Sequence, residues 1–174
     1  MKKLKKDEFL IKTGSSTGPL LIVYTGILRV YCQDEKGKDK TIDFRSRGEM
    51  TGIYPPYYEE GKYKTWFTIQ ALTDCKLIGI PAHFNKTLFS TKKSIWDTIE
   101  KNIFWERYLR TEKRLRSLLV DDASKRYTDF INEFPDIHES IPLYQIASYL
   151  GITSVSLSRI RASIYTPSGS GKTQ

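Results

Sequence analysis

The fold is decided near the end of the chain, in Ile141-Pro-Leu-Tyr-Gln-Ile-Ala-Ser-Tyr-Leu-Gly-Ile-Thr-Ser-Val-Ser-Leu-Ser-Arg-Ile-Arg161. This stretch predicts two short helices joined by a tight turn. Pro142 suits the first position of a helix, where its missing N–H is no loss. Gly151 ends the first helix, because glycine adopts the left-handed conformation at little cost. One helical face then collects the apolar residues Leu143, Ile146, Ala147 and Leu150.

The second helix begins after a capping residue, either Thr153 or Ser154, since both carry a hydroxyl that can accept a backbone hydrogen bond. Its inner face is expected to consist of Val155, Leu157 and Ile160. The polar residues on or beside its outer face are Ser154, Ser156, Ser158, Arg159 and Arg161.

A short polar helix with arginines, held by a supporting helix, fits the major groove of DNA. Hydroxyl and guanidinium groups reach base edges and phosphates there, and a bidentate arginine on guanine is the commonest specific contact. An ordinary helical hairpin with a solvated outer face shows the same periodicity. The pattern alone therefore leaves DNA binding and a structural hairpin both open.

The detailed residues resemble a known motif. Ile146-Ala-x-x-Leu-Gly-Ile-Thr153, followed by Ser156-Leu-Ser-Arg-Ile160, resembles the DNA-reading helix-turn-helix of the Crp/Fnr family of bacterial transcription regulators. The resemblance implies that Arg159 reads a base. Taken with the outer face of the helix, it predicts a DNA-binding set of Thr153, Ser154, Ser156, Ser158, Arg159 and Arg161.

Two positions depart from the pattern of some family members. Ser154 replaces an arginine and Val155 replaces a glutamate, so the operator sequences of those members do not transfer to this chain. Val155 either contacts a thymine methyl group or packs inward, and we expect inward packing.

Upstream of the hairpin, residues 9 to 81 have the pattern of short strands separated by turns. Leu20–Tyr24, Gly26–Cys32, Thr41–Arg45, Trp66–Leu72 and Cys75–Ile80 are each apolar or alternating. Strands at this spacing indicate an antiparallel roll or barrel and, with the helices that follow, an α+β fold. The Crp/Fnr resemblance extends here, through Tyr24-Thr-Gly-Ile-Leu-Arg-Val-Tyr31, Gly48-Glu49 and Ala71-Leu-Thr-Asp-Cys-Lys-Leu77, and implies an effector-sensing β-roll.

The expected effector is not a cyclic nucleotide. Family members that bind one carry an Arg-Ser or Arg-Thr pair on the cyclic phosphate, whereas this chain has Thr65-Trp66 at that place. Lys64-Thr65 supplies a cation and a hydroxyl but lacks the planar fork of arginine. Cys32 and Cys75 are too few for the iron–sulfur cluster of other members.

Residues 53–67 form an aromatic-rich insertion between two predicted strands, which could line a pocket for an apolar or aromatic effector. Apolar rings with a few polar groups are typical of small-molecule sites, but the same rings also suit a loop that packs on itself or on a second subunit. The candidate effector pocket is Gly48, Glu49, Tyr54, Tyr57, Tyr58, Thr65 and Trp66.

From about Lys93 to Leu119 the chain has no glycine or proline, which predicts one long helix. Its apolar residues form more than one stripe, so the helix must bury two faces. One face covers the roll and the other meets the same helix of a second copy. This agrees with the dimerisation helix of the resembled family, which we assign to Trp96, Ile99, Ile103, Phe104 and Tyr108.

Composition and net charge indicate which class of binding partner the protein favours. The 174-residue chain is 39% hydrophobic, with a net charge of +8 and a pI near 9.4. A basic chain favours a polyanionic partner, but the excess lies mainly at the N-terminus and in a run on the long helix, not on the hairpin. That run is Arg107, Arg110, Lys113, Arg114 and Arg116.

Catalysis, cofactors and membrane insertion have no support in the sequence. His83 and His138 are isolated, so they form neither a metal triad nor a nucleophile and base pair. No signal peptide and no spanning segment are found, and we expect a cytoplasmic protein. No cofactor or metal is expected.

We therefore expect a β-roll domain over 1–92, a dimerisation helix over 93–120, a helix-turn-helix domain over 121–164 and a flexible tail over 165–174. The predicted function is a homodimeric DNA-binding regulator with a small effector. Its partners are double-stranded DNA and a second copy, with RNA polymerase open as a further partner. The alternative is a small-molecule-binding roll, or a cupin-like enzyme, whose C-terminal helices are structural.

Overall fold

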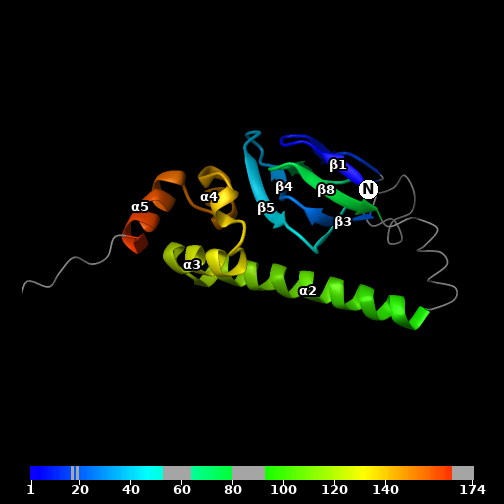
Figure 1. Ribbon diagram of the computed structural model, residues 1–174. Coiled ribbons are helices and arrows are strands. Elements are labelled where there is room, and N and C mark those ends of the chain that lie inside the picture. Colours follow the sequence, from blue (N-terminus) through cyan, green and yellow to red (C-terminus); the bar gives the residue numbers. More distant parts are fainter. Residues whose placement is uncertain (17, 19, 53–63, 80–92, 166–174) are drawn as a thin grey trace, which may run out of the picture. The chain divides into compact units, whose positions relative to one another are not determined.

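The computed structural model describes residues 1–16, 18, 20–52, 64–79 and 93–165, with side chains except at 93–100, 102–104 and 165 (Figure 1). Its contacts divide the chain into two compact units, Met1–Glu112 and Lys113–Gln174. The first contains the strands and most of the long helix, and the second contains the shorter helices. The domain boundaries expected from the sequence stay predictions.

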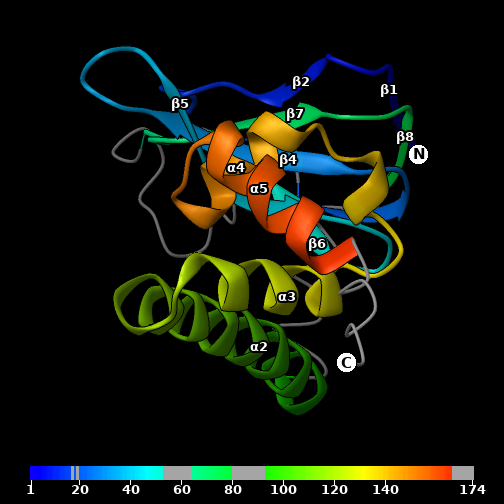
Figure 2. The ribbon, with the colours of Figure 1, turned by 90° about the vertical axis from the view of Figure 1, so that its left-hand side faces the viewer.

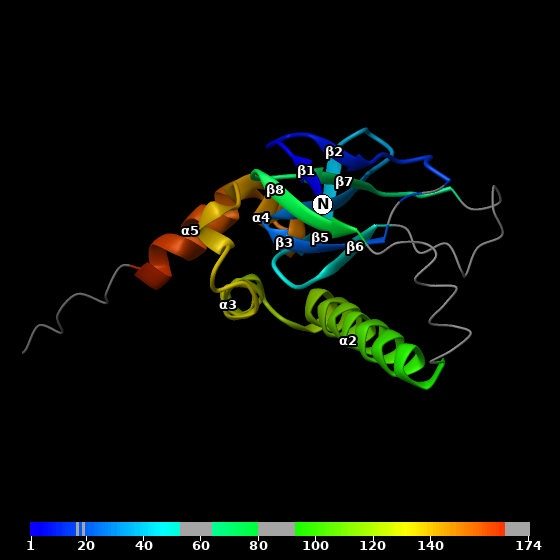
Figure 3. The ribbon, with the colours of Figure 1, turned by 45° about the vertical axis from the view of Figure 1, so that its right-hand side comes forward.

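The first unit is a roll of two antiparallel sheets. One sheet has the strand order β1 (Lys2–Leu4), β8 (Cys75–Gly79), β3 (Leu20–Thr25) and β6 (Met50–Gly52), which can be followed in Figure 3. The other has the order β2 (Phe9–Ile11), β7 (Thr68–Ala71), β4 (Leu28–Gln33) and β5 (Asp39–Arg45). The predicted antiparallel roll and α+β class are confirmed.

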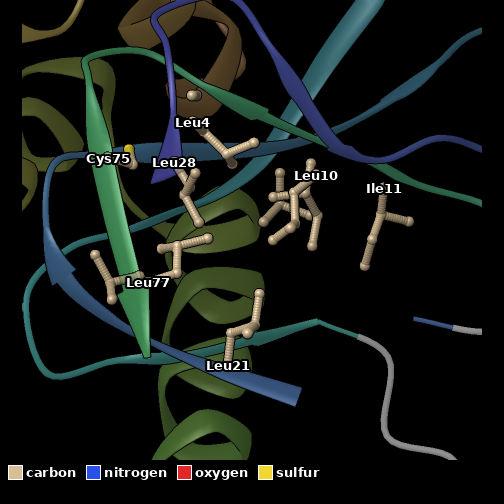
Figure 4. Packing of buried hydrophobic residues seen from close by; sticks show 11 residues of the cluster. Leu4, Leu10, Ile11, Leu21, Leu28, Cys75 and Leu77 are labelled. Carbon is tan, nitrogen blue, oxygen red and sulfur yellow. The ribbon is translucent and has the colours of Figure 1, made fainter. Parts of the chain in front are cut away.

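The core of the roll lies between the two sheets. In β4 and β7 the register pairs Leu28 with Ala71 and Val30 with Ile69, which puts four apolar side chains on one face. Leu77 on the opposite sheet is fully buried in the same cluster (Figure 4). Apolar residues at every second position therefore form one continuous core.

Gly26 makes the turn between β3 and β4 possible. Its φ is 96°, and a Cβ at this position would lie 2.6 Å from the carbonyl oxygen of Asp74. No residue with a side chain fits there without moving the backbone.

After the strands, the predicted long helix is confirmed as α2 (Lys93–Val120). It is followed by α3 (Ala123–Glu133), the 3-10 turn η2 (His138–Ser140), α4 (Leu143–Leu150) and α5 (Ser154–Tyr165). Asp122 caps α3, because its Oδ1 accepts the Lys125 N–H at 2.8 Å.

In the second unit, α3, α4 and α5 pack against one another (Figure 2). Phe130 and Phe134 of the α3 segment lie 5.5 and 6.0 Å from the Tyr149 ring of α4, centroid to centroid. Tyr127 is also buried. Aromatic side chains of the α3 segment therefore support the first helix of the hairpin.

Candidate functional site

The turn between α4 and α5 has the geometry that its glycine predicts. Gly151 has φ 69° and ψ 30°, in the left-handed region. Its N–H donates to the Ser148 carbonyl at 3.3 Å, and the Ile152 N–H donates to the Ala147 carbonyl at 3.0 Å. These bonds use carbonyls that the end of a helix leaves unpaired, so the turn is stiff.

Thr153, one of the two predicted caps, begins α5. Its Oγ1 accepts the Ser156 N–H at 3.1 Å, and its carbonyl accepts the Leu157 N–H at 3.0 Å. The Thr153 and Ser156 hydroxyls are also 2.9 Å apart and bonded to each other. Both hydroxyls therefore shape the start of the helix.

The inner face of α5 rests on Leu157, which is fully buried. The prediction that Val155 packs beside it is wrong, since Val155 is 62% exposed. Two residues that are two positions apart on a helix point to nearly opposite sides, so Leu157 inside requires Val155 outside. Ile160, three positions after Leu157, is half-buried as expected.

The outward face of α5 contains four of the six residues predicted to bind DNA, together with Val155. Thr153, Ser154, Ser158 and Arg159 are exposed, whereas Ser156 and Arg161 are half-buried. The Ser158 hydroxyl donates to the Ser154 carbonyl at 3.0 Å. In the part of the chain that the structure describes, the Arg159 guanidinium has no hydrogen bond or ion pair.

Arg114 fastens the end of α2 to the hairpin within the second unit. Its guanidinium lies 4.2 Å from the centre of the Tyr149 ring, and its Nη2 donates to the Tyr149 carbonyl at 3.0 Å. The neighbouring Ile146, Ala147 and Leu150 are buried. The supporting helix is thereby fixed by both a cation–π contact and a charged hydrogen bond.

The first unit contains a second candidate site, a cavity of about 340 Å³ beside α2. Strand β3, the end of β5, the following turn, the start of β6 and α2 all contribute to it. Its lining residues are Ile22, Arg45, Gly48, Glu49, Met50, Glu106, Arg107 and Arg110.

Ion pairs connect this wall of the roll with α2. The Arg110 Nη1 lies 2.5 Å from Glu49 Oε1 and 3.8 Å from Asp43 Oδ1. Arg45, which is 5% exposed, forms an ion pair with Asp43 and donates to the Phe44 carbonyl at 3.0 Å. Asp43 therefore lies between two arginines.

Glu49 also holds the turn that follows β5. Its Oε2 accepts the Ser46 N–H at 2.6 Å and the Ser46 hydroxyl at 3.2 Å. The Gly48 N–H donates to the Val23 carbonyl at 2.8 Å, which ties the same turn to β3. One carboxylate thus bonds to the turn through one oxygen and to α2 through the other.

Arg107 differs from the other two arginines. Among the described residues no hydrogen bond or ion pair reaches its guanidinium. Solvent reaches the side chain, but the surrounding protein displaces enough water to lower its pKa below the ordinary arginine value, to about 10. Burial is the largest cause of the lowered pKa, and the positive charge of Arg45 is the next.

The predicted effector residues divide between this cavity and other places. Gly48 and Glu49 line it. Thr65 is buried elsewhere and donates its hydroxyl to the Lys12 carbonyl at 3.1 Å, and Trp66 is 59% exposed. Tyr54, Tyr57 and Tyr58 lie outside the described residues.

Sequence reasoning did not assign Arg45, Arg107 and Arg110 to a site. The available signal was the spacing of the last two, three residues apart on a predicted helix and therefore on one face. The sequence showed these residues only as part of a basic run. The place of Arg45 could not be predicted in this way, because it depends on the pairing of β5 with β4, which brings Arg45 opposite Leu28.

The predicted dimer helix is described only in part. Trp96, Ile99, Ile103 and Phe104 belong to α2, but their side chains lie outside the described residues. Tyr108 is 56% exposed and stacks on Trp105 with a centroid distance of 5.5 Å.

Within the described ranges, no three His, Cys, Asp or Glu side chains lie close enough together to bind a metal ion. No helix in the same ranges has the length and apolar character needed to span a bilayer.

Comparisons with known proteins place this geometry in context. Residues 1–92 match the cyclic nucleotide-binding domain family. No curated protein matches the sequence. Among solved structures, FixK2 from Bradyrhizobium japonicum is 17% identical, with a TM-score of 0.75 over 99% of this chain and 87% of that chain.

Two further structures are similar. The c-di-GMP-responsive global regulator CLP of Xanthomonas campestris is 16% identical, with a TM-score of 0.70 over 94% of this chain and 84% of its own. A Crp/Fnr-family transcriptional regulator from Thermus thermophilus is 14% identical, with a TM-score of 0.65 over 98% of this chain and 89% of its own. At these identities the likeness shows the fold.

Proposed function

Because this chain belongs to the cyclic nucleotide-binding domain family and has the fold of Crp/Fnr regulators, we propose that it is a sequence-specific transcriptional regulator. It binds double-stranded DNA as a homodimer, and a small effector bound to its roll controls that binding. No catalytic group takes part in this function.

The observation that carries the DNA-binding proposal is the outward face of α5. Arg159 extends from it without a protein partner in the described part of the chain, next to the exposed Ser154 and Val155. The inner face is fixed by Leu157, and the helix is stiffened at its start by Thr153. A rigid helix with one free guanidinium fits the major groove, where arginine bonds to guanine O6 and N7.

The exposure of Val155 gives it a role in this proposal. An aliphatic side chain on the recognition face gains no favourable interaction from water. In the major groove it can make an apolar contact with a thymine methyl group. We assign Val155 to that contact, and Ser154 and Ser158 to nearby base edges or phosphates.

The dimer proposal rests on apolar side chains that α2 leaves in solvent. Trp105 is 61% exposed and Leu109 45%, next to the exposed Tyr108. Their neighbours Arg107 and Arg110 line the cavity of the roll, so the charged side of this segment faces its own domain. A helix with its apolar side in solvent is covered best by the same helix of a second copy. Two recognition helices about one duplex turn apart then read a near-palindromic site.

The effector is not a cyclic nucleotide in this proposal. A cyclic phosphate needs a hydroxyl beside its arginine, and the Thr65 hydroxyl is already bonded to the Lys12 carbonyl. The residue before it is Lys64, which lacks the bidentate geometry of arginine.

The DNA-binding proposal is tested with Arg159→Ala, using Arg47→Ala as the control. Both substitutions remove one exposed positive charge, but Arg47 lies in the turn after β5, in the first unit, whereas Arg159 lies on α5, in the second. On its preferred site the Arg159 variant should lose about 1–3 kcal/mol of binding free energy, while non-specific DNA should bind both variants alike. Equal loss in the two variants on the preferred site would refute the assignment of Arg159.

A further inference from the structure

The cavity beside α2 has an arrangement of charge that points to the chemistry of its ligand. Two of its three arginines already have carboxylate partners, Arg45 with Asp43 and Arg110 with Glu49. The third, Arg107, has none within the described ranges. Glu106 also lines the cavity, but it forms no ion pair with Arg107.

The Arg107 guanidinium has no ion-pair partner among the described residues, and the effects of burial and of the nearby arginines on its charge outweigh those of the Asp43 and Glu49 carboxylates. Its five N–H donors form a planar fork that matches the oxygens of a carboxylate or a phosphate. The positive charges of Arg45 and Arg110 act on the same guanidinium, and protein atoms have displaced part of the water that otherwise solvates its charge.

We propose that this cavity is the effector site and that its ligand is a small organic acid, whose carboxylate or phosphate oxygens bind the Arg107 guanidinium. The proposal rests on the effector-responsive function proposed above and names the ligand class of that site. It differs from cyclic nucleotide recognition because the anion is held by the long helix and not by the segment that contains Thr65.

The size and the remaining lining support an acid with an uncharged body. A volume of about 340 Å³ lies in the range of small-molecule sites, which starts near 300 Å³. Ile22 and Met50 add apolar surface to the lining of the cavity. A free inorganic ion occupies only a fraction of this volume, whereas a compact organic acid places its oxygens on Arg107 and its carbon skeleton against the two apolar side chains.

Binding in this place also suggests how the effector acts. Arg110 bonds to Glu49 at 2.5 Å, and Glu49 holds the Ser46 N–H at 2.6 Å. An anion close to Arg107 attracts the Arg110 guanidinium and weakens its pair with Glu49. That change moves α2 relative to the turn after β5, in the helix that we propose forms the dimer.

The test is calorimetric titration of the full-length protein at constant ionic strength with sodium benzoate, its uncharged isostere benzamide, and sodium phosphate. The variants are Arg107→Gln, which removes the charge, Arg107→Lys, which keeps it without the fork, and Arg47→Gln as the matched surface control. Circular dichroism establishes that each variant is folded.

We expect saturable binding of benzoate, little binding of benzamide, and weaker binding of phosphate, because phosphate lacks the apolar body. Arg107→Gln should weaken benzoate binding about tenfold or more, as expected for the loss of a charged hydrogen bond. Arg107→Lys should fall between, and Arg47→Gln should bind as the native protein does. If phosphate binds more tightly than benzoate, the oxyanion site at Arg107 is supported, and the ligand is a phosphorylated compound.

Two results would overturn the proposal: no saturable binding of either anion, or equal affinities in the Arg107 and Arg47 variants. The titrations contain no DNA. A failure here leaves the DNA-binding proposal intact, and a failure of that proposal leaves this one to be decided by the titration.

Discussion

Arg107 and Arg159 are both arginines without a partner in the described part of the chain, yet their surroundings differ. Arg159 stands on an exposed helical face, where water solvates its charge, and in the proposed complex DNA replaces that water. Arg107 stands in a protein-lined cavity, where its pKa falls to about 10. The first arrangement costs little in the free protein, whereas the second leaves a less well solvated charge, which the proposed anion would neutralise.

The lowered pKa of Arg107 gives a stability prediction with a definite sign. The unfolded chain holds this proton to a higher pH than the folded protein, whose Arg107 pKa is lowered to about 10. Folding is therefore opposed by the charge at pH 7, and stability due to this group rises as the pH increases above about 10. Arg107→Gln should raise the melting temperature at pH 7 without added anion, whereas Arg47→Gln should not. A lower melting temperature for Arg107→Gln would show that the charge stabilises the free protein.

Replacement of Gly151 by alanine should lower the free energy of unfolding for two separate reasons. Replacement by alanine requires a left-handed conformation that costs about 1–2 kcal/mol, and the new Cβ would lie 3.2 Å from Leu118 Cδ2. Gly37 has a similar φ of 74° with nothing near its Cβ position, so Gly37→Ala isolates the conformational cost. Urea unfolding should show a larger loss in the free energy of unfolding for Gly151→Ala than for Gly37→Ala. Equal losses would mean that Leu118 moves aside freely.

At the scale of elements, the predictions from sequence succeeded where one signal dominated. The long helix was predictable because 28 residues lack glycine and proline, and the roll because alternation recurs in five segments. Strands β1, β2 and β6 have three residues each, which is too short for alternation to show. Val155 was misplaced because three apolar residues in one helix were assigned to one face without regard to their angles.

The cap of α3 provides an element-scale test. Asp122 accepts the Lys125 N–H at 2.8 Å, so Asp122→Ala leaves that N–H without a partner in the first turn. We expect a loss of about 1 kcal/mol in the free energy of unfolding, and only a small loss for Asp122→Asn, which keeps an acceptor. Denaturant unfolding followed by circular dichroism measures both. Equal losses would show that the carboxylate charge matters more than the cap.

For the whole molecule, α2 is the element that we propose forms the dimer. In the described part of the helix, the cations at 107 and 110 face the roll while Trp105, Tyr108 and Leu109 are exposed. The sequence predicted that α2 buries two faces. It did not show that the face toward the roll is the charged one, because that depends on how the turn after β5 meets the helix.

The dimer proposal gives a whole-molecule prediction. Trp105→Glu with Tyr108→Glu places two charges on the exposed apolar face, and we expect sedimentation to show single-chain mass at micromolar concentration. Tyr24→Glu, at a 48% exposed aromatic of β3, serves as the control and should remain dimeric. A native protein of single-chain mass would contradict the proposed dimer.

The central claim is that the protein reads a specific DNA sequence as a dimer. It is tested most directly by selecting binding sites from a random DNA pool with the native protein, with and without benzoate, at moderate salt. Moderate salt suppresses the non-specific phosphate binding of a chain with net charge +8. We predict a two-fold symmetric motif with half-sites about one duplex turn apart, each containing a guanine that Arg159→Ala no longer selects. No enriched motif under either condition would contradict the claim.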